Sequence, residues 1–220
     1  MESLVAETEE SGGDESGIWL SIGDLMSGLL LIFVLLFVAA VIQLQTYIEQ
    51  AQERRIMIIM ALKEELSEHD IKAELDAETG DISIMDSVLF DEGQWTLKRK
   101  GRDFLDVFIP VYSQVIFSSP DIEEEVVRVI VEGHTSSAGS DSFNMKLSLD
   151  RANSVAGYII GDLDFPNQVD FTGKLMAAGR GEIEADQATD APGDRRVVFR
   201  FQFRGQTFQE WARGGEETPG

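Results

Sequence analysis

The sequence contains no cysteine, which excludes a disulfide framework, a thiolate metal site and a cysteine nucleophile. Basic residues are scarce: 18 Lys and Arg stand against 40 Asp and Glu, and none of the 18 precedes Arg54. Because nucleic-acid binding needs a basic surface that displaces counterions from phosphates, the net charge of −22 excludes a nucleic-acid partner. The only histidines are His69 and His134, so we expect no metal site and no cofactor.

A long apolar run near the start of the chain predicts a membrane helix. Residues 18–42 read IWLSIGDLMSGLLLIFVLLFVAAVI. At 1.5 Å per residue this run spans roughly 37 Å, enough to cross a hydrocarbon core of about 30 Å. A cleaved signal peptide is the alternative, but it requires a basic leader and a shorter apolar stretch. Residues 1–17 form an acidic leader rich in Ser and Gly, which we expect to be disordered.

Asp24 lies inside this run and is the most informative residue of the chain. A carboxylate within a membrane helix costs several kcal/mol unless it faces protein or water, so it predicts an ion-translocation site. Helical spacing puts Ser21, Ser27 and Gly28 on the same face, a stripe that favours close contact with partner helices. The transported ion is expected to be H⁺, with Na⁺ as the alternative. A carboxylate that reaches the water at the bilayer edge is the structural alternative.

The segment that follows, residues 43–70, contains no Gly or Pro and is rich in helix formers, which predicts a helical linker. Two interpretations of its apolar side chains stay open, a coiled pair with a second copy or packing on the chain's own domain. The side chains concerned are Ile48, Ile56, Ile59, Met60 and Leu66.

Residues 71–205 alternate between strand-like and helix-like patterns, which predicts an α+β domain with a mixed sheet and helices packed on one side. The expected elements are a hairpin over 71–76 and 81–86, a short edge segment at 87–93, helices over 97–117 and 141–160, and strands over 126–132 and 195–203. Residues 206–220 are expected to be a flexible C-terminal tail.

Four ordered motifs in this region resemble the OmpA C-terminal family, which OmpA, Pal and MotB share. They are VLFDEGQWTLKRKGRDFL, VEGHTSSAGSDSFNMKLSLDRANSVAGYI, AAGRGE and GDRRVVF. Together they lie within residues 80–204. The resemblance implies a domain without catalytic residues that binds the peptidoglycan stem peptide, whose diamino acid carries carboxylate and ammonium groups.

The resemblance also implies which residues bind that peptide. Arg151 would hold a carboxylate through bidentate charge-assisted hydrogen bonds. Asn144 and the backbone near Phe143 would satisfy neighbouring amides, and Leu147 would pack behind the site and orient Arg151. As alternatives, Leu147 belongs to the core and Asn144 caps a turn.

Three further positions stand at the edge of the implied groove. Arg195 and Arg196 match the paired arginines of the family pattern, although Arg196 is equally able to pair with a carboxylate of the domain. The family usually has an acid after the Gly-His-Thr run, placed to receive the ligand ammonium, but here that position is Ser136. A neutral hydroxyl cannot pair a charge, and Asp141 is a candidate substitute.

A membrane Asp in the setting IGDLMSGLLLIF, joined to such a domain, resembles MotB and most closely the ZorB subunits of Zorya anti-phage systems. This resemblance implies a homodimer inside a ring of MotA-like (ZorA) membrane subunits in the bacterial inner membrane. The N-terminus would be cytoplasmic and the domain periplasmic, although Arg54 and Arg55 after the span favour the opposite orientation by charge counting.

Three other functions are weighed against this motor subunit. They are a flagellar MotB-like stator subunit, a passive cell-wall tether in which Asp24 does not titrate, and a peptidoglycan hydrolase. The last is disfavoured by the lack of Cys, of a Ser-His-Asp order and of a metal cluster.

Overall fold

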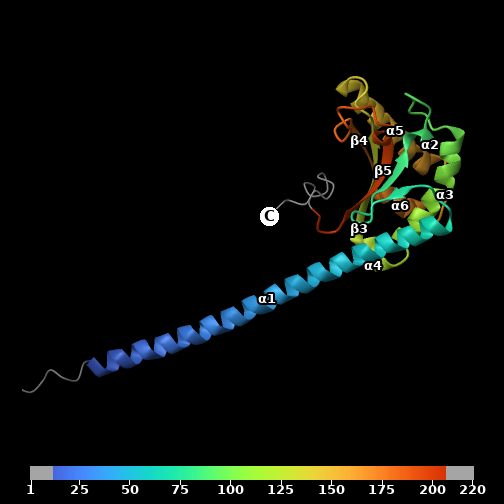
Figure 1. Cartoon of the computed structure of the whole chain (residues 1–220). Coiled ribbons are helices and arrows are strands. Elements are labelled where there is room, and N and C mark those ends of the chain that lie inside the picture. The colour runs from blue at the N-terminus through green and yellow to red at the C-terminus, as the bar shows by residue number, and fades with distance from the viewer. Residues whose placement is uncertain (1–11, 207–220) are drawn as a thin grey trace, which may run out of the picture. The chain divides into compact units, whose positions relative to one another are not determined.

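The computed structural model describes residues 12–206, with side chains from Trp19 onward, and the chain divides after Ala51 into two compact units (Figure 1). Residues 1–11 of the predicted leader and 207–220 of the predicted tail lie outside the described residues. Helix α1, Gly12–Glu68, is 57 residues long and contains no proline that would interrupt it. It begins within the segment expected to be disordered.

The first unit is the N-terminal part of α1. Every side chain from residue 19 to residue 50 is exposed in the single chain, and most of those up to Ile42 are apolar. This part is long and apolar enough to cross a membrane, and none of its most apolar stretch is buried. Such a surface requires lipid or partner helices around it.

The second unit contains a five-stranded mixed sheet, which confirms the predicted α+β class (Figure 1). The strand order is β1-β2-β5-β3-β4, and only the β3 and β4 pair is parallel. The strands are β1 Glu74–Leu75, β2 Ile82–Met85, β3 Val126–His134, β4 Leu175–Gly181 and β5 Arg196–Phe203. The helices are α2 Asp86–Leu89, α3 Arg99–Ile116, α4 Pro120–Glu125, α5 Asp141–Gly161 and α6 Gln168–Lys174, with a short 3-10 turn η1 at Pro192–Asp194.

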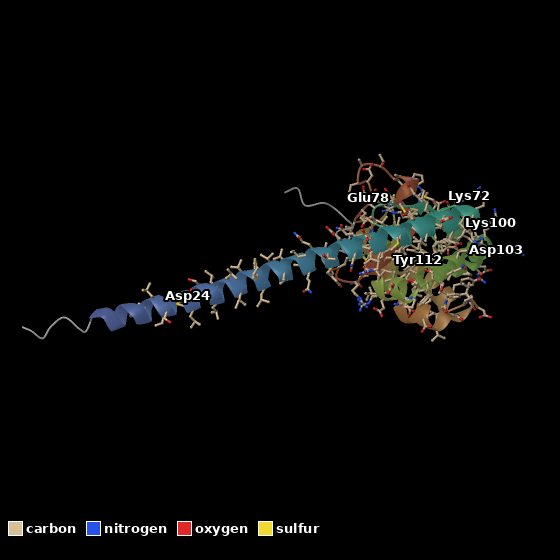
Figure 2. The ribbon with its side chains drawn as sticks, turned by 90° about the horizontal axis from the view of Figure 1, so that it is seen from below. Asp24, Lys72, Glu78, Lys100, Asp103 and Tyr112 are labelled. Carbon is tan, nitrogen blue, oxygen red and sulfur yellow. The ribbon has the colours of Figure 1, made fainter. Side chains whose placement is uncertain are left out.

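One apolar core lies between the helices and a single face of the sheet. Alternate residues of β5 enter it, because side chains of a strand point to opposite faces in turn. Tyr112 of α3, labelled in Figure 2, stacks on Phe201 with ring centroids 5.1 Å apart, and Phe108 meets Phe199 edge-on at 4.9 Å. Interlocking rings of this kind hold α3 to the centre of the sheet.

The last turns of α1, from Gln52 to Glu68, belong to this core. Ile58 and Leu62 are completely buried, and Ile59 and Leu66 nearly so. Of the apolar side chains considered for a coiled pair, Ile48, Ile56 and Met60 are exposed. Packing on the chain's own domain therefore accounts for only part of the apolar residues of the linker.

Charged side chains also fix these turns to the domain. Glu125 at the end of α4 is 2% exposed and accepts hydrogen bonds from Arg54 at 3.2 Å and Arg55 at 3.3 Å. Arg55 also donates to the carbonyl oxygen of Arg204 at 2.9 Å. A buried carboxylate held by two guanidinium groups is a specific attachment, since either group alone would leave lone pairs unsatisfied.

The sequence prediction was wrong for residues 87–93. They form the short helix α2 and an exposed turn instead of an edge segment of the sheet. Leu89 is the last residue of α2 and Phe90 follows it, and both side chains are buried against the core. The apolar pair that resembled part of a strand therefore belongs to the end of a helical turn. The prediction also omitted α4, α6 and β4; the last reads LMAAGRG, which has no β-branched residue to mark it.

Candidate functional site

The second unit contains a cavity of about 470 Å³ between α2, α5 and the loops that follow β3 and precede β5. Its walls combine charged, polar and apolar side chains. The lining residues are Asp86, Ser87, Phe90, Asp91, Glu92, Gly93, Lys98, Thr135, Ser136, Ala138, Phe143, Asn144, Leu147, Arg151, Asp190 and Arg195.

Arg151 of α5 is the buried cation of this cavity, with 1% of its surface exposed. Its Nη2 lies 2.9 Å from Oδ2 of Asp86, and its Nε donates to the carbonyl oxygen of Gln94 at 3.0 Å. The guanidinium stands over the ring of Phe90, 5.4 Å from its centroid. Its Nη1 is buried without a hydrogen-bond partner among the described residues. A buried donor of this kind favours an incoming anion.

Burial and pairing act against each other in this ion pair. Burial raises the pKa of Asp86, while the positive charges of Arg151 and Arg195 lower it in part. Burial likewise lowers the pKa of Arg151, and the neighbouring Asp86 opposes that change. Each charge therefore depends on the other, and an additional carboxylate beside Nη1 would further stabilise the guanidinium.

Arg195 lies at the other end of the cavity, beside Ser136. Its Nη1 donates to Oδ1 of Asp190 at 2.7 Å and lies 3.5 Å from the hydroxyl oxygen of Ser136. Ser136 is 4% exposed, so its hydroxyl faces the cavity rather than the bulk solvent. The cavity thus carries a cation and an anion at this end as well.

Asn144 is tied into the loops around the cavity. Its Nδ2 donates to the carbonyl oxygen of Ala138 at 3.2 Å and also contacts the carboxylate of Glu182. The side chain is 2% exposed. Both amide hydrogens are therefore engaged within the domain.

The structure brings six of the residues singled out from the sequence to one cavity and leaves two outside it. The six are Ser136, Phe143, Asn144, Leu147, Arg151 and Arg195. Asp141 is the exposed first residue of α5 and does not line the cavity. Arg196 does not line it either; its Nη2 pairs with Glu184 at 3.1 Å.

The cavity residues that sequence reasoning missed include Asp86, Phe90, Lys98 and Asp190. Asp86 and Phe90 lie in the segment that was assigned to a strand and an edge. Lys98 Nζ reaches the carbonyl oxygen of Phe90 at 3.2 Å, a contact that no spacing rule predicts. Asp190 lies in the irregular chain between β4 and β5, which carries no periodic pattern.

Two glycines allow α5 to approach the sheet closely enough to place its side chains. A Cβ on Gly133 of β3 would lie 2.1 Å from the carbonyl oxygen of Ser148, and one on Gly179 of β4 would lie 2.6 Å from Cγ of Leu149. The hydroxyl of Ser148 accepts from the backbone N–H of Gly181 at 2.9 Å. This contact fixes the helix that carries Asn144, Leu147 and Arg151.

The second candidate site is the part of α1 around Asp24, labelled in Figure 2, where side chains stand out on all sides of the helix. Because residues 12–68 are helical, Ser21, Ser27 and Gly28 share the face of Asp24. The hydroxyl of Ser27 donates to the carbonyl oxygen of Gly23 at 2.7 Å. A Cβ on Gly28 would meet no atom within 4 Å, which leaves room for a neighbouring helix.

Among the residues from 12 to 206, no group of three His, Cys, Asp or Glu side chains is placed to hold a metal ion. In particular, the buried His134 has Glu132 at 3.9 Å and Glu184 at 3.6 Å, both beyond hydrogen-bonding distance.

Known proteins resemble the chain both along most of its length and over the domain alone. Zorya protein ZorB of Escherichia coli is 27% identical over 224 residues, which cover 91% of this chain and 94% of that protein. Outer membrane protein A of Serratia marcescens is 36% identical over 108 residues, 49% of this chain and 26% of that protein. A solved MotB-like protein from Desulfovibrio vulgaris covers 73% of this chain, and 98% of its own, with a TM-score of 0.53 and 17% identity.

The model of the OmpA family matches residues 89–198. This match takes in α3, β3, α5 and β4 together with most of the cavity residues. It covers half of the 220 residues, and the chain therefore belongs to the OmpA family, a group of structural, non-enzymatic domains.

Proposed function

We propose that this chain is a wall-anchored, stator-type subunit of a proton-driven motor in the bacterial inner membrane, acting in Zorya anti-phage defence. In this role α1 crosses the membrane, Asp24 binds and releases the proton, and the domain holds the peptidoglycan stem peptide. The partners are a second copy of the chain and a ring of MotA-like ZorA subunits.

The observation that carries the proposal is the extent of the similarity to ZorB. It covers 91% of this chain, and so includes the apolar helix as well as the domain. OmpA proteins, by contrast, match about half of the chain. A relationship that extends over both parts supports a function that needs both, an ion-binding helix and an anchor.

The exposure of α1 supports the need for partner helices. Asp24 has no neighbour outside its own helix within the described part of the chain, and the apolar side chains around it are exposed. In a membrane a carboxylate in this position requires protein or water beside it, because lipid does not solvate the anion. Alternate access to that carboxylate from the two sides converts proton entry, worth about 2.3 kcal/mol per 100 mV, into movement of the surrounding helices.

The cavity supports the anchoring role. Arg151 presents a buried Nη1 without a partner among the described residues, and a stem-peptide carboxylate supplies the missing acceptor. Since wall binding requires the domain to be periplasmic, the N-terminus would be cytoplasmic. The two arginines that oppose this orientation by charge counting, Arg54 and Arg55, are bound to Glu125.

The test is the substitution Asp24→Asn in cells that carry the chain with its MotA-like partner. Protection against phage, measured as efficiency of plating, should fall to the level of cells without the system, because an amide cannot release a proton. The matched control is Glu49→Gln, which removes an exposed carboxylate of α1 beyond residue 42 and should leave protection intact.

Both variants must reach the membrane in normal amounts and be retained by purified cell walls to the same degree. Full protection by Asp24→Asn would contradict proton transport through this residue. The chain would then act as a passive wall tether.

A further inference from the structure

Asp190 stands at the end of the cavity where Ser136 supplies only a hydroxyl. It lines the cavity with Ser136 and Arg195, and it lies in the chain between β4 and η1. A single guanidinium nitrogen, Nη1 of Arg195, lies 2.7 Å from Oδ1 of Asp190 and 3.5 Å from the oxygen of Ser136. Arg195 thus bridges the two side chains, and the carboxylate is next to the neutral hydroxyl.

The backbone around Asp190 is bound to the same loop that carries Ser136. The hydroxyl of Ser137 lies 2.9 Å from the carbonyl oxygen of Asp186 and 3.3 Å from that of Thr189. Thr189 in turn donates its hydroxyl hydrogen to Asp186 at 2.6 Å. The residue before Asp190 therefore contacts the residue after Ser136, which fixes the position of Asp190 at this end of the cavity.

The other acids of the cavity are less suited to receive a cation there. Asp86 is engaged by Arg151 at 2.9 Å, and its side chain is only 12% exposed. Asp91 and Glu92 lie in the exposed turn after α2, where the side chain of Asp91 is 76% exposed and 3.9 Å from Lys98. The side chain of Asp190 is also 54% exposed, but Arg195 binds one of its oxygens at 2.7 Å and lies 3.5 Å from the hydroxyl oxygen of Ser136. Asp190 is thereby oriented at this end of the cavity, and its carboxylate retains further lone pairs for a second donor.

We propose that Asp190 receives the side-chain ammonium of the stem-peptide diamino acid while Arg151 holds its carboxylate, so that Asp190 determines specificity for a diamino acid. This inference rests on the proposed wall-binding role of the cavity, and it names the residue that binds the ammonium group of the ligand. The two charged ends of a zwitterionic ligand then match two opposite charges of the cavity, one carried by α5 and the other by the loop before β5.

The experiment compares two probes on the full chain in detergent, meso-diaminopimelate and 2-aminopimelate. The second probe keeps both carboxylates and the chain length but lacks one ammonium group. The wild-type chain should bind meso-diaminopimelate about tenfold more tightly, the effect of one charge-assisted hydrogen bond. Asp190→Asn should lose this preference and keep its affinity for 2-aminopimelate, whereas Arg151→Ala should weaken binding of both probes.

Two further variants test whether the preference depends on a carboxylate at this end of the cavity and not on another acid of the domain. Asp141→Asn removes an exposed acid that does not line the cavity and should retain the preference for meso-diaminopimelate. Adding Ser136→Asp to the Asp190→Asn chain should restore the preference, because the new carboxylate stands at the same end of the cavity.

Two results would overturn the inference while leaving wall binding in place. One is a wild-type chain that is retained by purified cell walls but shows no preference between the probes. The other is an Asp190→Asn chain that keeps the preference or loses both probes equally. A wild-type chain that binds neither probe nor cell walls would instead refute the proposed function itself.

Discussion

Nη2 of Arg151 lies 2.9 Å from Oδ2 of Asp86, an ion pair that joins the middle of α5 to the first residue of α2. The pair is nearly dry, since the side chain of Arg151 is 1% exposed and that of Asp86 is 12% exposed. It holds the guanidinium against Phe90 with Nη1 still unpaired among the described residues. Asp86 therefore positions the residue that we assign to ligand binding.

Replacing Asp86 should cost stability, because it leaves a buried guanidinium without its counter-ion. We expect Asp86→Asn to lower the free energy of unfolding by about 2–3 kcal/mol, the loss of a charge-assisted hydrogen bond in a dry site. Urea unfolding of the detergent-solubilised chain, followed by circular dichroism, measures this change. Asp91→Asn, at an exposed position, should stay within about 0.5 kcal/mol of the wild type. Equal effects of the two substitutions would show that the ion pair does not stabilise the domain.

Periodicity and motif order predicted the frame of the domain from the sequence, but they did not predict the inner face of the cavity. The alternation RVVFRFQF gave β5 correctly, because one face of that strand enters the core and the other does not. Arg151 and Asn144 were found because they stand at fixed positions of a family motif on α5. Asp86 was assigned to the end of a strand, where an acid normally faces solvent, and only the tertiary structure turns it toward Arg151.

Asp190 illustrates a second limit. It belongs to an irregular segment whose position depends on side-chain contacts such as those of Ser137 with the carbonyl oxygens of Asp186 and Thr189. No local propensity encodes contacts between residues so distant in sequence. The parallel edge strand β4 was missed for a related reason, since Gly179 is there to admit α5 and not to favour a strand.

Glu125 and its neighbour Glu124 provide a matched test of the attachment of α1 to the domain. Glu125 is 2% exposed and accepts from Arg54 and Arg55, whereas Glu124 is 69% exposed and pairs with Arg204 at 3.3 Å. Glu125→Gln should destabilise the chain by about 1–3 kcal/mol, because the amide accepts only one of the two guanidinium groups well.

The same substitution should speed hydrogen exchange in residues 52–68, measured by mass spectrometry. Glu124→Gln should leave both quantities within the error of the measurement, as expected of an exposed ion pair. Unchanged exchange in Glu125→Gln would show that the apolar contacts of Ile58 and Leu62 suffice to hold these turns.

Gly133 and Gly157 should respond in opposite directions to the same substitution. In Gly133→Ala the new methyl group would meet the carbonyl oxygen of Ser148, so α5 must move away from β3, at a cost of about 3 kcal/mol. In Gly157→Ala the methyl group meets nothing within 4 Å on an exposed face of α5, and helix propensity should stabilise the chain by about 0.5–1 kcal/mol.

Retention by purified cell walls should fall in Gly133→Ala and persist in Gly157→Ala, because only the first displaces Arg151. Thermal unfolding followed by circular dichroism gives the accompanying change in stability. A Gly133→Ala chain with wild-type stability and retention would contradict the close contact of α5 with the sheet.

His134 should make the domain less stable as the pH falls below neutrality. Burial, reinforced by the positive charge of Arg196, lowers the pKa of His134 from its ordinary 6.5 to about 3. Between these values the unfolded chain binds a proton that the folded chain does not, so stability is complete above pH 6.5 and declines toward pH 3. Burial raises the pKa of Asp81 to about 6 and also raises that of Glu132, and these two acids act in the opposite direction. The difference between the wild type and His134→Asn removes their contribution, because both chains contain them.

Urea unfolding at several pH values below 6.5 should show the wild type losing up to about 1.4 kcal/mol per pH unit relative to the variant. Parallel curves for the two chains would mean that His134 takes up its proton in the folded domain.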